Sequence, residues 1–144
     1  DALVKSIQTI QKKYYEQGIQ HEQVAILSYY KLKTLIPLTI NTTTCDYAMF
    51  KGKDSGAYSY IIEPNDIGNL AQIKEEFGIS DDTCVLFKTI TSFKGLEKDI
   101  LFLIVPNLDE FKEKYPERVD NFLMQLYVGA SRAKFKLYYF EYSI

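Results

Sequence analysis

Three short runs of mainly apolar residues, 24–27, 85–90 and 100–105, constrain the fold more than any other feature of the sequence. A short apolar run bounded by polar residues is typical of a strand that is buried on both faces, as the strands of parallel sheets are. The three runs therefore predict buried strands of a largely parallel sheet.

Segments with the spacing of amphipathic helices lie before and between these runs. In the first segment the apolar positions are Leu3, Ile7, Ile10 and Tyr14. This stripe, which ends at Gly18, predicts a packing helix within residues 1–20. Asn65 and Gly78 are the expected ends of a second, capped helix of about three turns.

Helical spacing also covers 111–133, with an interruption at Pro116, and an aromatic strand at 137–142 closes the sequence. A further strand is expected at 58–62, after a turn at 53–56. Strands that alternate with helices indicate a layered α/β fold with a largely parallel sheet.

The composition is that of one ordinary globular domain, because 47% of the 144 residues are hydrophobic and 25% are charged. No window approaches the roughly 18 apolar residues of a membrane span, so a soluble protein is expected. Cys45 and Cys84 lack CxxC spacing and no secretory signal precedes them, which predicts buried thiols in a reducing cytoplasm. A zinc site is not expected, because His21 is the only histidine.

The net charge of the chain and the identity of its first residue limit the binding partners that can be expected. The net charge of −2 argues against a broad positive surface, so any contact with nucleic acid must be local. Since the first residue is Asp1 rather than Met, the sequence is expected to be part of a larger protein. Most of the 12 tyrosines and 9 phenylalanines, including Tyr29, Tyr30 and those at 138–140, are expected to pack in the core.

Residues 89–97 read Thr-Ile-Thr-Ser-Phe-Lys-Gly-Leu-Glu and begin at the end of the second apolar run. Gly95 lets the backbone approach a ligand closely, and Lys94 and the hydroxyl groups can meet phosphate oxygens. Glu97 can accept hydrogen bonds from sugar hydroxyls. The segment is a candidate nucleotide-binding loop, although its local chemistry also allows a polar connection with a glycine for geometry.

Residues 126–134 read Leu-Tyr-Val-Gly-Ala-Ser-Arg-Ala-Lys and end an apolar helical segment. A glycine inside a helix costs about 1 kcal/mol relative to alanine, so Gly129 indicates close packing against a neighbouring element. Arg132 is expected to emerge near that contact. Taken alone, it is also compatible with a solvated or salt-bridged surface residue.

In this order and spacing, the two segments resemble motifs V and VI of the UvrD/Rep-like superfamily 1 DNA helicases. Residues 89–97 fit the pattern T-x-H-x-x-K-G-L-E, except that Thr91 stands in place of the usual histidine. Residues 127–134 fit Y-V-[AG]-x-[ST]-R-A-[KR] at every fixed position. A weaker resemblance to motif IV lies at 24–29, where Lys31 is the nearest cation and the family has an arginine.

The resemblance implies that 1–144 is the second, C-terminal RecA-like domain of such a helicase, with three α/β/α layers. In the family, ATP with Mg²⁺ lies between two RecA-like domains. The resemblance implies that Arg132 is the catalytic arginine finger, which reaches the γ-phosphate. The implied nucleotide-binding residues are Lys94, Gly95 and Glu97. The implied contacts to the DNA backbone are Thr89, Thr91 and Ser92.

The sequence contains no G-x-x-x-x-G-K-[ST] phosphate loop, so these 144 residues are not expected to hydrolyse ATP alone. The phosphate loop and the magnesium ligands are expected from the first RecA-like domain. The expected partners of this chain are that domain and single-stranded DNA. Asp109 and Glu110 are expected to begin a solvated helix rather than to bind metal. An alternative of another class is a non-catalytic module, binding nucleic acid or protein, that kept the fold and lost the motor.

Overall fold

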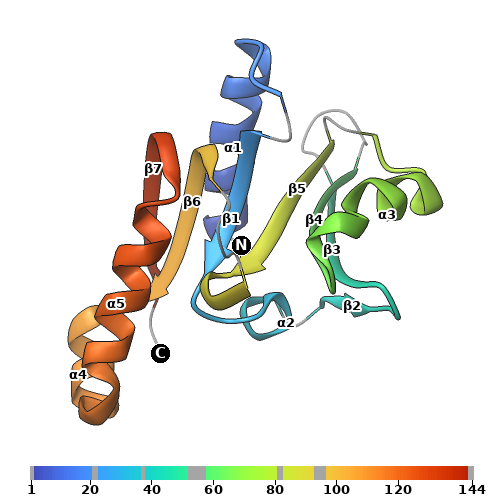
Figure 1. The fold of residues 1–144 in the computed structure, drawn as a ribbon. Helices are drawn as coiled ribbons and strands as arrows, with labels where there is room; N and C mark the ends of the chain where they lie inside the picture. Colours follow the sequence, from blue (N-terminus) through green and yellow to red (C-terminus); the bar gives the residue numbers. More distant parts are fainter. Residues whose placement is uncertain are drawn as a thin grey trace.

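The computed structural model describes residues 2–20, 23–36, 38–51, 58–80, 83–92 and 97–142. Its centre is a seven-stranded sheet in the order β2-β3-β4-β5-β1-β6-β7 (Figure 1). The strands are β1 (Val24–Ser28), β2 (Ile40–Asn41), β3 (Cys45–Lys51), β4 (Tyr58–Pro64), β5 (Cys84–Thr89), β6 (Lys98–Pro106) and β7 (Ala133–Tyr142). Strands β4, β5, β1, β6 and β7 run parallel, whereas β2 and β3 pair antiparallel. The predicted α/β class with a mostly parallel sheet is confirmed.

The three apolar runs form the middle of this sheet, where β1 lies between β5 and β6. All five residues of β1 are buried, as are the last seven of β6. Side chains along a strand point alternately to the two faces, so a strand covered on both sides needs apolar residues at every position. This is the physical reason why these runs lack the alternation of a half-exposed strand.

Helices cover both faces of the sheet. The α-helices are α1 (Ala2–Glu16), α2 (Leu32–Leu35), α3 (Leu70–Phe77), α4 (Leu108–Lys114) and α5 (Val119–Ala130). Short 3-10 turns are η2 (Ile67–Asn69), η4 (Ile90–Ser92) and η5 (Pro116–Arg118). Side chains of α1 and α2 pack on one face, and those of α3, α4 and α5 pack on the other.

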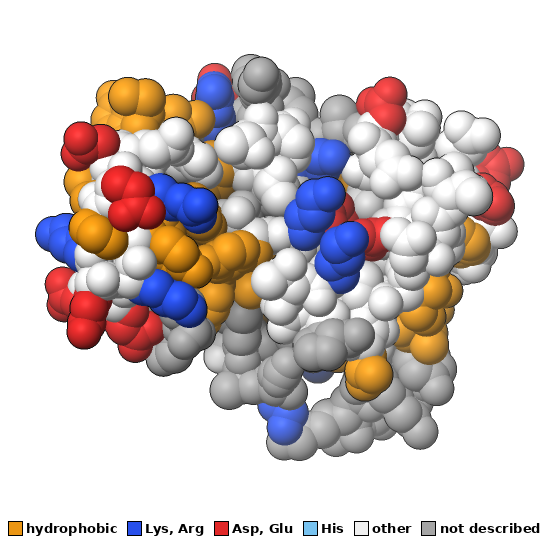
Figure 2. Space-filling view, turned by 90° about the horizontal axis from the view of Figure 1, so that it is seen from below, with side chains coloured by type: hydrophobic (Ala, Val, Ile, Leu, Met, Phe, Trp, Pro, Cys, Tyr) orange, Lys and Arg blue, Asp and Glu red, His pale blue; other side chains and the backbone are white. Residues whose placement is uncertain are grey.

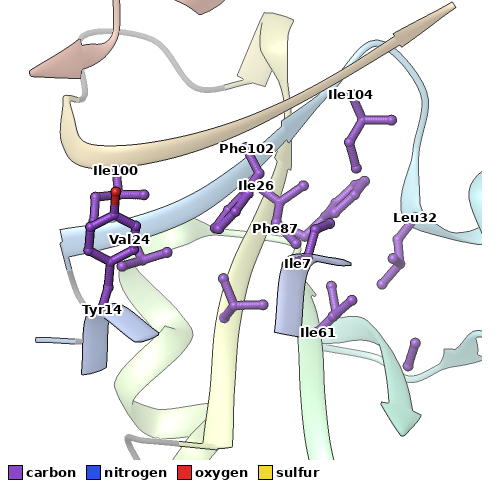
Figure 3. Packing of buried hydrophobic residues seen from close by; sticks show 12 residues of the cluster. Ile7, Tyr14, Val24, Ile26, Leu32, Ile61, Phe87, Ile100, Phe102 and Ile104 are labelled. Atoms are coloured by element: carbon purple, nitrogen blue, oxygen red, sulfur yellow. The ribbon is translucent and has the colours of Figure 1, made fainter. Parts of the chain in front are cut away.

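The core on the α1 face confirms the predicted amphipathic helix (Figure 3). Ile7 and Tyr14 of α1 are buried against strand residues such as Phe102, and Gly18 takes a φ of 93° just beyond the helix. The hydroxyl groups of Tyr14 and Tyr138 lie 2.7 Å apart. This hydrogen bond joins the first helix to the last strand.

Two parts of the sequence-based description need correction. The cap expected from Asn65 is absent, because its side chain donates to the carbonyl of Thr43 (2.8 Å), while Asp66 accepts from the N–H of Gly68 (3.0 Å). The helix itself starts with η2 and ends at Gly78, which is left-handed with a φ of 67°. The polar stretch before residue 52 contains β2 and β3, which the sequence did not predict. The turn expected at 53–56 lies outside the described residues.

Both cysteines are buried thiols, as predicted. Cys45 and Cys84 belong to the small core beneath α3, together with Ile62 and Ile73. Within the described ranges, no helix is both long and apolar enough to cross a membrane.

Candidate functional site

The first part of the candidate site is a cluster of hydroxyl groups at the end of β5. Thr89 ends the strand, and Thr91 and Ser92 follow it in η4. The Oγ1 of Thr89 lies 2.7 Å from the Oγ of Ser92 and 3.5 Å from the Oγ1 of Thr91. Thr91 and Ser92 are exposed. The three predicted DNA-contacting residues are thus neighbours. Ser92 Oγ donates to the carbonyl of Thr89 (3.0 Å), so a hydroxyl of this cluster would donate to a phosphate by rotating away from its present partner.

The second part is the end of α5, where Gly129 packs against η4. A Cβ atom at Gly129 would lie 3.1 Å from Cδ1 of Leu103 and 3.5 Å from Cδ1 of Ile90. Ile90 is the second residue of the 89–97 segment, so the two motif-like segments are in direct contact. The close packing predicted for Gly129 is confirmed, because a Cβ atom there would require the Leu103 side chain to shift by a few tenths of an ångström.

Arg132 follows α5 in a tightly held turn. Its N–H donates to the carbonyl of Gly129 (3.2 Å), and its carbonyl accepts from the N–H of Lys98 (2.9 Å). Its side chain is half-buried, and among the described residues its Nε has no hydrogen-bond partner although that atom is buried. The backbone is therefore fixed on both sides, while part of the guanidinium has its hydrogen-bonding capacity unused.

The strand register separates the candidate residues into two groups. Ser28 lies opposite both Thr89 and Ile104, which places Thr89 at the carboxyl edge of the sheet. Lys98 lies opposite Ala133 where β6 and β7 begin, so Glu97 and Arg132 flank each other at the amino edge. Glu97 is exposed. Helix α5 runs between the two edges, antiparallel to β7 (Figure 1).

Three further expectations concern neighbouring residues. Lys94 and Gly95 lie outside the described residues, so their predicted roles stay predictions.

Asp109 and Glu110 form the first turn of α4, where Asn107 Oδ1 accepts from the N–H of Glu110 (3.1 Å). The helix-starting interpretation of the acidic pair is confirmed. Within the described ranges, no three His, Cys, Asp or Glu side chains group as a metal site would require.

Sequence reasoning missed two charged residues near the end of β5, Lys88 and Glu63. Lys88 is 7% exposed, and its Nζ donates to the carbonyl of Pro64 (2.8 Å). Glu63 accepts from the N–H of Leu32 (3.2 Å). Burial raises the pKa of the Glu63 carboxyl, although this hydrogen bond and the charge of Lys88 oppose the shift. The only signal in the sequence is a lysine within the apolar run 85–90.

The raised pKa of Glu63 predicts a pH dependence of stability. A carboxyl group that binds protons more tightly in the folded state destabilises the fold as pH rises through its ordinary and then its folded pKa. Glu63→Gln removes that ionisation, so the melting temperature of the variant should exceed that of the wild type more at pH 8 than at pH 4. Thermal melts at both pH values test this, and a gain that is larger at pH 4 would contradict it.

The contact at Gly129 predicts a second stability effect. Gly129→Leu forces a large side chain against Leu103 and Ile90 and should lower the free energy of unfolding by about 1–3 kcal/mol. Gly129→Ala should have a much smaller effect, because better helix propensity offsets a tight contact with flexible side-chain ends. Urea unfolding of both variants measures the difference, and equal midpoints would argue against close packing here.

Comparison of the sequence with known proteins yields no match to a protein-family model and none to a curated protein.

Proposed function

We propose that this chain is the second RecA-like motor domain, with three α/β/α layers, of an ATP-dependent superfamily 1 DNA helicase. The proposal is carried by one observation: the two motif-like segments, 89–97 and 126–134, meet through Ile90 and Gly129. Helices on both faces of a mostly parallel sheet are compatible with a RecA-like domain.

The amino edge offers the chemistry that an ATP site needs from its second domain. Arg132 offers a guanidinium on a turn held by two backbone hydrogen bonds, so the backbone from which it would reach a γ-phosphate is fixed. The exposed carboxylate of Glu97, next to the Lys98–Arg132 bond, suits the ribose hydroxyls. The phosphate loop and the Mg²⁺ ligands would come from the first RecA-like domain of a larger protein.

The carboxyl edge offers a separate site for single-stranded DNA. The clustered hydroxyls of Thr89, Thr91 and Ser92 suit phosphate oxygens without reading the base sequence. Because Thr91 replaces the family's histidine, this chain keeps a hydrogen-bonding group there and loses an aromatic one. Nucleotide and DNA would then lie at opposite edges of the sheet, which β5, η4 and α5 connect. Closure of the two RecA-like domains around ATP at one edge could therefore alter DNA binding at the other.

The ribose role of Glu97 gives a direct test. In the longest natural protein that contains these residues, Glu97→Ala should raise the KM for ATP by about 10- to 150-fold, since a hydrogen bond to a charged group is worth about 1.5–3 kcal/mol. The KM for 2′,3′-dideoxy-ATP should not change, because that nucleotide lacks both hydroxyls. The exposed Glu117 supplies a matched control as Glu117→Ala. Equal effects of Glu97→Ala on both nucleotides would exclude the ribose contact.

A further inference from the structure

The outer edge of β7 has no strand beside it in the part of the chain that the structure describes. This strand ends the sheet, and it pairs on one side only, with β6. An unpaired edge strand presents a row of backbone N–H and C=O groups that another strand can bind. Because β7 is ten residues long, this edge offers room for an extended pairing.

Exposed hydrophobic side chains gather around the same edge. Of the nine large ones in the described ranges, five belong to α5 and β7: Leu123, Met124, Tyr127, Phe135 and Tyr139. Figure 2, which keeps the left-to-right order of Figure 1, shows hydrophobic side chains gathered on the left, over α4, α5 and β7. The sequence placed Tyr139 in the core, whereas 46% of its surface is exposed. Such a concentration of apolar surface is typical of a binding surface for another protein.

Helix α5 contributes to this surface through one flank. Phe122 and Gly129 are buried toward the sheet, and successive residues of a helix are about 100° apart, so Leu123 and Tyr127 lie on the flank. A helix that connects two parallel strands of one sheet almost always makes a right-handed crossover. In the β6-α5-β7 connection that hand turns this flank toward β7, the outermost strand in Figure 1. Leu123 and Tyr127 therefore project over β7 toward its open edge.

The second half of β7 is the regular part of the strand. The register with β6 shifts between Lys98 and Ile100, so β7 has an extra residue before Lys136. From Lys136 to Tyr142 the pairing is continuous. Since a bulge bends a strand, the segment 136–142 is the part suited to further pairing. If this segment pairs antiparallel with its own copy, end to end, Tyr139 falls on the two-fold axis.

The charges along β7 favour such an antiparallel copy. Lys134 and Lys136 lie near the start of the strand and Glu141 lies near its end, and all three are exposed. A parallel pairing in register would set each lysine opposite its own copy, which is destabilising. In the antiparallel pairing, Lys136 of one copy lies beside Glu141 of the other. Because this arrangement has two-fold symmetry, it closes as a dimer.

We propose that β7 pairs antiparallel with β7 of a second copy of this chain, so that one continuous sheet runs through a two-fold dimer. Tyr139 contacts its counterpart at the axis. The flanks of the two α5 helices approach each other above it, which removes Leu123 and Tyr127 from water. The inference goes beyond the proposed motor function and does not depend on it, because none of these side chains is assigned to nucleotide or DNA.

Sedimentation equilibrium of the longest natural protein containing these residues measures the dissociation constant of the dimer. Tyr139→Glu brings two carboxylates together at the axis and should raise that constant by at least about 30-fold, the loss typical of a central aromatic contact. Ile40→Glu is the matched control, because Ile40 is 43% exposed on β2, the opposite edge strand. It should associate like the wild type.

A cysteine at the axis gives an independent measurement. Opposite residues of an antiparallel pair have Cβ atoms about 4.5–5.5 Å apart, close to the separation in a disulfide. With oxidised glutathione, Tyr139→Cys should therefore form a covalent dimer, and Ile40→Cys should not. Cys45 and Cys84 are buried and serve as an internal background.

Three results would overturn the dimer: a wild type that stays monomeric at every concentration, equal dissociation constants for the wild type and Tyr139→Glu, or equal crosslinking of Tyr139→Cys and Ile40→Cys. A monomer whose β7 amides resist hydrogen exchange would show that another part of the longer protein covers the edge. The ATPase measurements of the motor proposal are unaffected by any of these results.

Discussion

Replacing Arg132 by alanine in the longest natural protein that contains these residues should lower the ATP turnover rate by about 10³- to 10⁵-fold. The guanidinium is expected to neutralise charge that accumulates on the γ-phosphate only in the transition state. ATP affinity should therefore change little. Steady-state turnover, together with equilibrium binding of a fluorescent ATP analogue, measures the two effects separately.

Two further variants make the result specific to the guanidinium. Arg132→Lys keeps the charge but loses the planar fork of donors, so it should restore only part of the turnover. Lys136→Ala removes an exposed cation four residues further along β7 and should leave turnover unchanged. Full turnover in Arg132→Ala would eliminate the arginine finger, whereas equal losses in Arg132→Ala and Lys136→Ala would indicate a general charge effect.

The largest effect on stability is expected at Phe122. Its side chain is fully buried, and its ring stacks on that of Phe111 at 4.3 Å between centroids. Phe122→Ala removes this contact and opens a cavity beneath α5, so it should lower the free energy of unfolding by about 3–5 kcal/mol. Urea unfolding measures the change.

Leu123→Ala is the matched control on the same helix, because Leu123 is 42% exposed. It should cost about 1 kcal/mol, since 42% of its surface stays exposed to water and no enclosed cavity is opened. A loss for Phe122→Ala as small as that of Leu123→Ala would mean that α5 does not pack on the sheet as described.

The secondary-structure elements that the sequence predicted well are buried strands, which are apolar at every position, and amphipathic helices, which are apolar along one face. The run 100–105 gave a buried central strand, and the stripe through Ile7 and Tyr14 gave α1. Gly78 ended α3 because its positive φ is costly for other residues. At these positions the local sequence pattern and the tertiary environment favour the same residue types.

The elements missed depend on long-range pairing. Strand β3 has a mixed composition and forms because β4 lies beside it, with Tyr47 opposite Ile62. Asn65 bonds to Thr43, a partner 22 residues away that no local pattern identifies. For the candidate site, the sequence indicated that Gly129 packs closely, but only the fold shows that Ile90 is its neighbour and that Glu97 and Arg132 share an edge.

The measurement that tests the central claim most directly is steady-state ATPase activity, with and without single-stranded DNA, of the longest natural protein containing this segment and of the 144-residue chain itself. A motor half predicts activity that DNA stimulates in the long protein and no activity in the short one. No activity in the long protein under either condition would contradict the motor and favour a binding module with the same fold.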